Sequence, residues 1–278
     1  MALKAEQLKG ELTEQIVSRV HDRLNRDRAD TAERFVRQFY ANVPPDDIIE
    51  SSPDQLYSAA LSIWQFAAQR KPGTARVRVY HPQLDEHGWQ SGHTVVEIIN
   101  DDMPFLVDSV TAELNRQGLT VHLVIHPVVR VRRDASGQLT DLYEPQAAPA
   151  EAMPESFMHI EVDEQTAPEL LEQVARSVEK VLTDVRYAVE DWQKMRAPML
   201  RILETVDHMP HALPDDEINE ARDFLLWLND DNFTFLGYRR YRFEGDGDEA
   251  RLAVVAGEGM GILRDDDVRG FDGLRNFA

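Results

Sequence analysis

Apolar residues recur at helical spacing in the first part of the chain. Residues 3–24 and 31–40 each place their apolar side chains three or four positions apart, which predicts two amphipathic helices. A third helix follows Ser52, because a serine, a proline and then Gln55 form the sequence signature of a capping box. A Lys-Pro-Gly sequence ends this helix. The pattern therefore predicts a helical N-terminal region over residues 1–73.

From residue 74 the apolar period changes to two, which is typical of strands. A helix that opens at Pro104 and ends at Gly118 interrupts the strands, and Pro127 places the longest strand at an edge or a bulge. This order predicts an α+β fold. The predicted strands are residues 76–81, 94–99, 119–133, 139–143 and 157–162.

A long helix is expected from about residue 167 to 206, and Pro198 is expected to kink or divide it. Its apolar residues repeat every seven positions, as in a coiled coil. Two interpretations stay open: the helix covers the core, or it forms a self-association surface. The main series is Leu171, Val178, Val185, Trp192, Met199 and Val206.

After Pro210 and Pro214 a second unit is expected to begin. A helix capped by Asp215 and Asp216 comes first, then a strand over 233–243 and its hairpin partner over 251–256. The expected domains are a helical region over 1–73, an α+β domain over 74–212 and the start of a second unit over 213–278.

Composition excludes several classes of function. The net charge of −20 disfavours binding to nucleic acid or to an anionic membrane. The chain has no cysteine, which excludes disulfides, thiolate zinc sites and cysteine nucleophiles. We expect a cytoplasmic protein, since neither a signal peptide nor an apolar stretch of membrane-spanning length is present. The last nine residues contain no closing element, which favours a segment of a longer chain.

The turn after the second strand is the leading candidate site. Its residues are Asn100, Asp101, Asp102, Met103, Pro104 and Phe105. The two carboxylates could hold an ammonium group while helix N–H groups hold a carboxylate, which would suit a free amino acid. The alternative is that both aspartates only cap the following helix.

Other candidates are weaker. One candidate is a zinc site, because His122, His126 and His159 could share a sheet face. The alternative is that they are half-buried or solvent-facing histidines without a metal, since no motif with zinc-ligand spacing is present. Residues 257–261 read as a flexible turn and not as a phosphate loop, and the aspartate runs at 230–231 and 265–267 read as solvated loops. The residues assign no catalytic, cofactor or metal site.

Four segments resemble the start of the large NAD-specific glutamate dehydrogenases of bacteria. The similarity runs from about Thr94 to Leu263. The segments are NDDMPFLVDSV at 100–110, VHLVIHPV at 121–128, SFMHIE at 156–161 and WLNDDNFTFLGY at 227–238.

The resemblance implies a non-catalytic N-terminal regulatory and assembly segment, followed by a PAS-like unit. The implied fold is ACT-like (ferredoxin-like), an antiparallel sheet with helices on one face, here preceded by the helical N-terminal region. It implies that NAD binds elsewhere in the parent enzyme, a homotetramer that converts glutamate to 2-oxoglutarate and ammonia. The expected partners are the rest of the polypeptide, other subunits and an amino-acid effector.

Two departures from the ACT pattern are visible. Phe105 stands where the family's turn has glycine, so we expect its ring to fill the ligand space. The strand at 76–81 is expected to take the sheet edge of the usual last strand. The alternatives are a stand-alone amino-acid sensor and, third, a self-contained enzyme that uses Asp101, Asp102 and His122.

Overall fold

The computed structural model describes residues 2–206, 214–245, 251–265 and 268. The chain divides into two compact units, Met1–Leu182 and Thr183–Ala278. None of the described helices is both long enough and apolar enough to cross a membrane.

Three helices open the first unit, as the apolar spacing predicts. They are α1 (Ala2–Arg23), α2 (Arg26–Ala41) and α3 (Pro53–Phe66). The capping box at the start of α3 is confirmed, since the side chains of Ser52 and Gln55 each accept a hydrogen bond from the other residue's backbone N–H. Buried Lys9 satisfies the end of α2, donating from Nζ to the carbonyl oxygens of Ala41 (2.8 Å) and Val43 (2.7 Å).

An antiparallel sheet follows the three helices. The strand order is β1-β2-β6-β4-β5, and β3 also pairs with β6. The edge strand β1 pairs with β2, as expected for the position of the usual last ACT strand. The strands are β1 (Arg76–Tyr80), β2 (Thr94–Asp101), β3 (Val121–Ile125), β4 (Val128–Arg133), β5 (Leu139–Tyr143) and β6 (Met153–Val162).

The prediction of one strand over 119–133 is wrong. The segment forms β3 and β4, which pair with different halves of β6. Pro127 lies at the break, because it has no N–H to donate to the sheet. Its carbonyl oxygen still accepts a hydrogen bond from the backbone N–H of Phe157 at 3.1 Å. Helix α4 (Leu84–His87) connects β1 to β2, α5 (Leu106–Arg116) connects β2 to β3, and the short 3₁₀ turn η2 (Pro145–Ala147) lies between β5 and β6. A further 3₁₀ turn, η1 (Pro45–Asp47), lies between α2 and α3.

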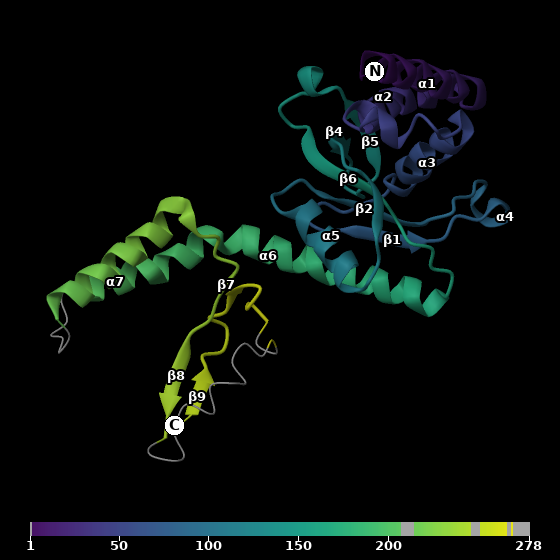
Figure 1. Ribbon diagram of the computed structural model, residues 1–278. Helices are drawn as coiled ribbons and strands as arrows, with labels where there is room; N and C mark the ends of the chain where they lie inside the picture. Colours follow the sequence, from purple (N-terminus) through teal and green to yellow (C-terminus); the bar gives the residue numbers. More distant parts are fainter. Residues whose placement is uncertain (1, 207–213, 246–250, 266–267, 269–278) are drawn as a thin grey trace. The chain divides into compact units, whose positions relative to one another are not determined.

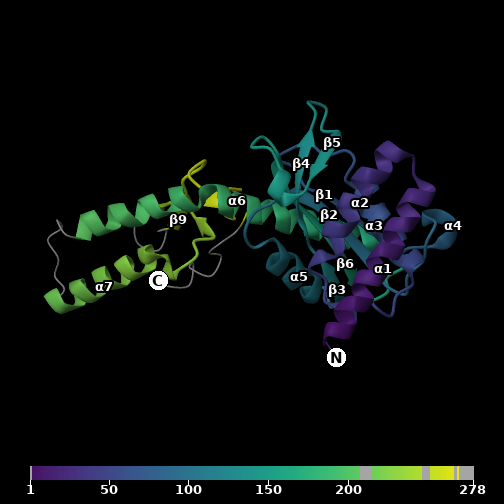
Figure 2. The ribbon, with the colours of Figure 1, turned by 90° about the horizontal axis from the view of Figure 1, so that it is seen from above.

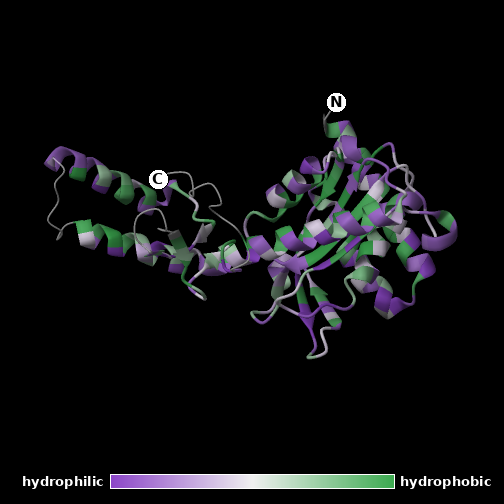
Figure 3. Ribbon diagram, turned by 90° about the horizontal axis from the view of Figure 1, so that it is seen from below, coloured by the Kyte–Doolittle hydropathy of each residue, from purple (hydrophilic) through white to green (hydrophobic). Residues whose placement is uncertain are grey.

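Helices cover both faces of this sheet. Figures 1 and 2 show α1–α3 on one face, and α5 with the first part of α6 (Pro168–Val206) on the other. The first interface is tightly packed: the ring of Phe35 lies 5.3 Å from that of Phe39 and 5.4 Å from that of Phe157 on β6. Figure 3 shows the central strands mostly in the hydrophobic colour. The α+β prediction is thus confirmed, and the N-terminal helices share a core with the sheet.

The helix α6 continues through Pro198, so the prediction that this proline divides it is wrong. Much of its heptad series is buried in this chain, including Val178 and Met199 at 0% and 6% exposure. Trp192 is an exception at 43%. The burial favours a core-covering helix over a self-association seam.

The second unit contains, besides α6, one more helix and four short strands in the described ranges. The strand predicted over 233–243 is two strands, β7 and β8, and each pairs with a later partner. Pro210 lies outside the described residues. The elements are α7 (Asp215–Trp227), the turn η3 (Leu228–Asn232), β7 (Gly237–Tyr238), β8 (Tyr241–Glu244), β9 (Arg251–Val254) and β10 (Met260–Gly261).

Candidate functional site

The turn from Asn100 to Phe105 lies where β2 leaves the sheet. Asn100 is fully buried, whereas Asp102 is exposed. The carboxylate of Asp101 accepts hydrogen bonds from Arg70 Nη2 (2.8 Å) and from the backbone N–H of Gly73 (3.0 Å). The prediction that Asp101 caps the next helix is therefore wrong, because its carboxylate is engaged by the α3–β1 connection.

The start of α5 also differs from the prediction. The helix begins at Leu106, its N-cap is Phe105, and no side chain provides a capping hydrogen bond. Phe105 has φ of 71°, in the left-handed region that favours glycine. The residue is 49% exposed, and the expectation that its ring fills the ligand space stays a prediction. A bulky residue in this conformation costs about 1–2 kcal/mol, and the turn is strained.

Asp101 belongs to a buried ion network under the N-terminal helices. Arg70 Nη2 donates to both Asp101 and Glu155 Oε1, the latter at 2.6 Å. Arg133 donates to both oxygens of Glu155, from Nε at 2.7 Å and from Nη2 at 2.8 Å. The side chains of Arg70, Glu155 and Arg133 are only 1–3% exposed. The network joins β2, β4 and β6 to the segment that follows α3.

A second buried network lies further along β2 and β6, the two central strands of the sheet. Glu97 is fully buried and accepts hydrogen bonds from Arg78 Nε (3.1 Å) and from the Tyr80 hydroxyl (3.0 Å). Ser62 of α3 reaches both of these partners, accepting from Arg78 Nη2 at 2.9 Å and lying 2.8 Å from the Tyr80 oxygen. The network thereby ties α3 to β1 and β2.

His159 lies between two carboxylates in this second network. It is fully buried, with Nδ1 3.7 Å from Glu97 Oε1 and Nε2 3.5 Å from Glu161 Oε1. Burial alone would lower the pKa of His159, but the two glutamates outweigh it and raise that pKa to about 9. The attraction is mutual: burial would raise the pKa of Glu97, yet His159 and Arg78 hold it below the usual value. At neutral pH the site therefore holds an imidazolium ion.

The histidines named in the sequence do not come together as a zinc site. His122 Nε2 lies 2.8 Å from Asp163 Oδ1, and its ring stacks on that of His93 at 4.5 Å. His126 Nε2 lies 2.7 Å from the Ser156 hydroxyl, on the opposite face of β6 from His159. Within the described residues no group of three or more metal-ligating side chains could hold a metal ion.

Asp163 is held ionised at the edge of this region. Thr120 provides the main hydrogen bonds, including its backbone N–H at 2.8 Å, and His122 adds a further contact. Together they lower the pKa of Asp163 to about 2. The exposed histidine pair thus stands beside a permanent negative charge.

Sequence reasoning missed Glu97, Arg70, Glu155 and Arg133. A signal for two of them was present. Glu97 interrupts a β-branched run that was predicted to be buried, and a buried carboxylate needs a cation. Glu155, His159 and Glu161 share a face at period two, but the predicted strand began only at residue 157. Arg70 carried no signal, because its partners are 31 and 85 residues away.

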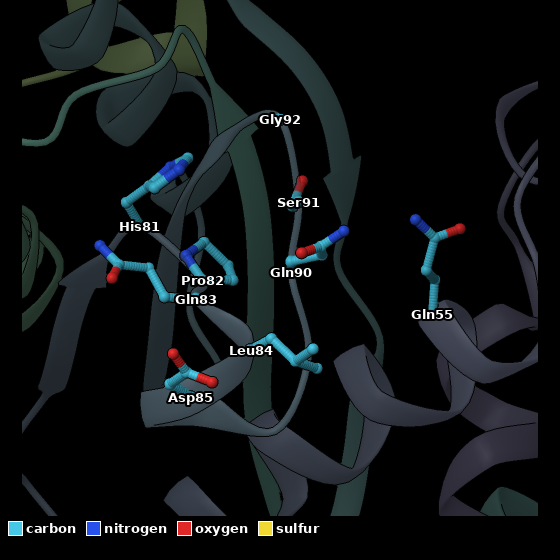
Figure 4. Close-up of a pocket in the computed structure, with 9 residues that line it drawn as sticks. All are labelled: Gln55, His81, Pro82, Gln83, Leu84, Asp85, Gln90, Ser91 and Gly92. Carbon is cyan, nitrogen blue, oxygen red and sulfur yellow. The ribbon is translucent and has the colours of Figure 1, made fainter.

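The first unit also has an open hollow of about 620 Å³ beside the β1–β2 connection. Figure 4 shows Gln83 and Asp85 on one side of it, Gln90 and Ser91 on the other, and Leu84 between them. Gln55 reaches it from α3, and its side-chain oxygen already accepts a hydrogen bond from Ser52. The lining is polar, and Asp85 supplies its one carboxylate.

Comparison with known proteins gives a consistent set of matches. Residues 35–178, which include the whole sheet, match the family model of the glutamate dehydrogenase ACT1 domain. The chain is 40% identical over 265 residues to an NAD-specific glutamate dehydrogenase of Halomonas elongata, and 33% identical over 230 residues to that of Pseudomonas aeruginosa. These matches cover 95% and 83% of this chain, but only 16% and 14% of the relatives. A Mycobacterium tuberculosis enzyme of the same name is 28% identical over 207 residues, 72% of this chain and 12% of that enzyme.

Removing Arg70 should destabilise the first unit strongly. Arg70→Met leaves Glu155 buried with half of its cationic partners, and we expect the free energy of unfolding to fall by about 3–5 kcal/mol. Arg132→Met is the matched control, because its ion pair with Asp141 is exposed and should contribute less than about 1 kcal/mol. Urea unfolding followed by circular dichroism measures both. Equal, small losses in the two variants would contradict the network's role.

The stability that His159 provides should depend on pH. Its pKa is raised from 6.5 to about 9 on folding, so the contribution is complete below about pH 6.5 and is lost as the pH rises through 9. This difference in pKa corresponds to on the order of 3 kcal/mol. We expect the stability gap between the parent chain and His159→Gln to shrink between pH 6 and pH 9.5 in urea unfolding. A gap that stays constant over this range would rule out a titrating His159.

The strain at Phe105 can be separated from the loss of its ring. Phe105→Gly and Phe105→Ala both remove the ring, but only glycine relieves the left-handed conformation. We expect the glycine variant to be more stable than the alanine variant by about 1 kcal/mol, the reverse of the usual order. Thermal and urea unfolding test this, and an alanine variant of equal or greater stability would count against the strain.

Proposed function

This chain belongs to the family of NAD-specific glutamate dehydrogenases, and from that premise we propose that it is a non-catalytic regulatory and assembly segment of such an enzyme. The whole enzyme of this proposal oxidises L-glutamate with NAD to 2-oxoglutarate, ammonia and NADH. The segment spans only 16% of the length of its Halomonas relative. The catalytic and NAD-binding parts are then assigned to the remainder of the longer polypeptide, and the location to the cytoplasm.

The observation that carries the proposal is the match of the ACT1 family model to the sheet region, over residues 35–178. The contacts inside this region support it. Of the three side chains that a self-contained enzyme would use, two are engaged in structural contacts, Asp101 with Arg70 and Gly73, and His122 with Asp163. These contacts hold elements of the fold together.

We propose that regulation acts through the β2–α5 turn. Asp102 keeps an exposed carboxylate there, and Phe105 is strained in a conformation that a bound molecule could stabilise or release. An amino-acid effector would contact Asp102 by its ammonium group. The network through Asp101 and Arg70 would carry a displacement of the turn to the N-terminal helices. Subunit contacts of a homotetramer are the second proposed role, and exposed Trp192 on α6 supports it.

The alternative is a stand-alone sensor that binds an amino acid at residues 100–105 without an attached enzyme. The exposed Asp102 carboxylate supports this reading equally well. The two proposals differ in what the rest of the polypeptide does, so the length of the natural reading frame separates them.

Three measurements on the chain test the proposal. We expect no glutamate-dependent reduction of NAD at any protein concentration, and glutamate-dependent NADH formation that tracks the purified chain would overturn the non-catalytic role. We expect calorimetry with glutamate, aspartate and arginine to show binding that Asp102→Ala weakens at least about tenfold while leaving stability almost unchanged. If none of the three binds, the turn is structural. Light scattering that shows only monomers would argue against self-association through α6.

A further inference from the structure

A hollow in the second unit brings together arginines and a glycine-rich turn. Its volume is about 610 Å³. Three segments form it: the end of α6, the β7–β8 region and the turn before β10. The lining residues are Pro198, Arg201, Ile202, Thr205, Tyr238, Arg240, Gly257, Glu258, Gly259 and Met260.

The turn that forms one wall is held firmly, in contrast to the flexible turn expected from the sequence. The backbone N–H of Gly261 donates to Asp191 Oδ2 at 3.0 Å, and Arg264 Nη2 donates to the same oxygen at 2.7 Å. Burial would raise the pKa of Asp191, but these donors and Lys194 lower it to about 2. Gly261 has φ of 60°, and a Cβ added there would lie 2.1 Å from the carbonyl oxygen of Leu236. The turn is thus anchored to α6 through the Asp191 carboxylate and to β7 through the pairing of β10.

The charges at the hollow favour an anion. Arg201 is exposed, and in the part of the chain that the structure describes its guanidinium pairs with no carboxylate. Arg240 Nη1 donates to Glu258 at 3.2 Å, in an ion pair whose side chains are 62% and 45% exposed. Two guanidinium groups against one carboxylate leave a local positive charge on a chain whose net charge is −20.

We propose that this hollow binds a small oxyanion, the phosphate or carboxylate group of a metabolite, between Arg201 and Arg240. The planar fork of a guanidinium matches both groups and can hold them by two parallel hydrogen bonds. The anion takes the place of Glu258 beside Arg240. The site is separate from the β2–α5 turn, and the proposal does not depend on amino-acid binding at that turn.

Titration of the ¹⁵N-labelled chain with inorganic phosphate, at constant ionic strength set with chloride, tests the site. We expect saturable shifts of the Gly257 and Gly259 amide resonances. Arg201→Gln should weaken the affinity at least about tenfold, because it removes one charge-assisted contact. Arg176→Gln is the matched control: its arginine is an exposed residue on the same helix, outside the hollow, and this variant should bind like the parent chain.

A gain of affinity separates binding from damage to the fold. Glu258→Gln removes the competing carboxylate and frees Arg240, so we expect it to tighten phosphate binding several-fold. Succinate in a parallel titration tells whether the site prefers carboxylate or phosphate. The proposal is overturned if neither anion gives saturable shifts of the two glycines, if Arg201→Gln binds as tightly as the parent chain, or if Glu258→Gln binds no more tightly.

Discussion

Ionisable side chains on the two central strands have to be neutralised where helices cover the sheet. They all project to the face beneath α1–α3, because they lie at even spacings along β2 and β6. An unpaired ion in such a place costs several kcal/mol, so every one of them needs a partner. The five residues are Glu97, Asp101, Glu155, His159 and Glu161.

The partners come from the segment after α3 and from two strands that already pair with the central strands. Arg70 follows α3, Arg78 lies on the edge strand β1, and Arg133 ends β4. Each reaches a carboxylate on β2 or β6, and His159 places one further positive charge between Glu97 and Glu161. The ion pairs therefore add side-chain links from the segment after α3, from the edge strand β1 and from β4 to the two central strands. For the proposed regulatory role this means that the β2–α5 turn is coupled through Asp101 to the helical region.

The sequence predicted the elements well where residues close together in the chain decide the local structure. The helices, the capping box at Ser52 and the buried run at 94–99 follow from spacing and capping chemistry. The failures occur where distant partners decide. Pro127 splits a strand because both halves pair with β6, and Phe105 takes a left-handed conformation that no local pattern predicts. Asp101 is of a residue type that often caps helices, but its carboxylate pairs with Arg70, which only the folded sheet brings near. Effector binding at residues 100–105 stays a prediction, because it depends on the chemistry of a ligand as well as on this chain.

Native-state hydrogen exchange tests most directly the claim that buried charge pairs join the N-terminal helices and the sheet into one cooperative body. Amides of α2 and of β6 are compared in the parent chain as urea is raised below the unfolding transition. We expect the slowest amides of both elements to open with the same free energy and the same urea dependence, as parts of one unfolding unit do. Opening of α2 at a clearly lower free energy, with β6 still protected, would contradict it.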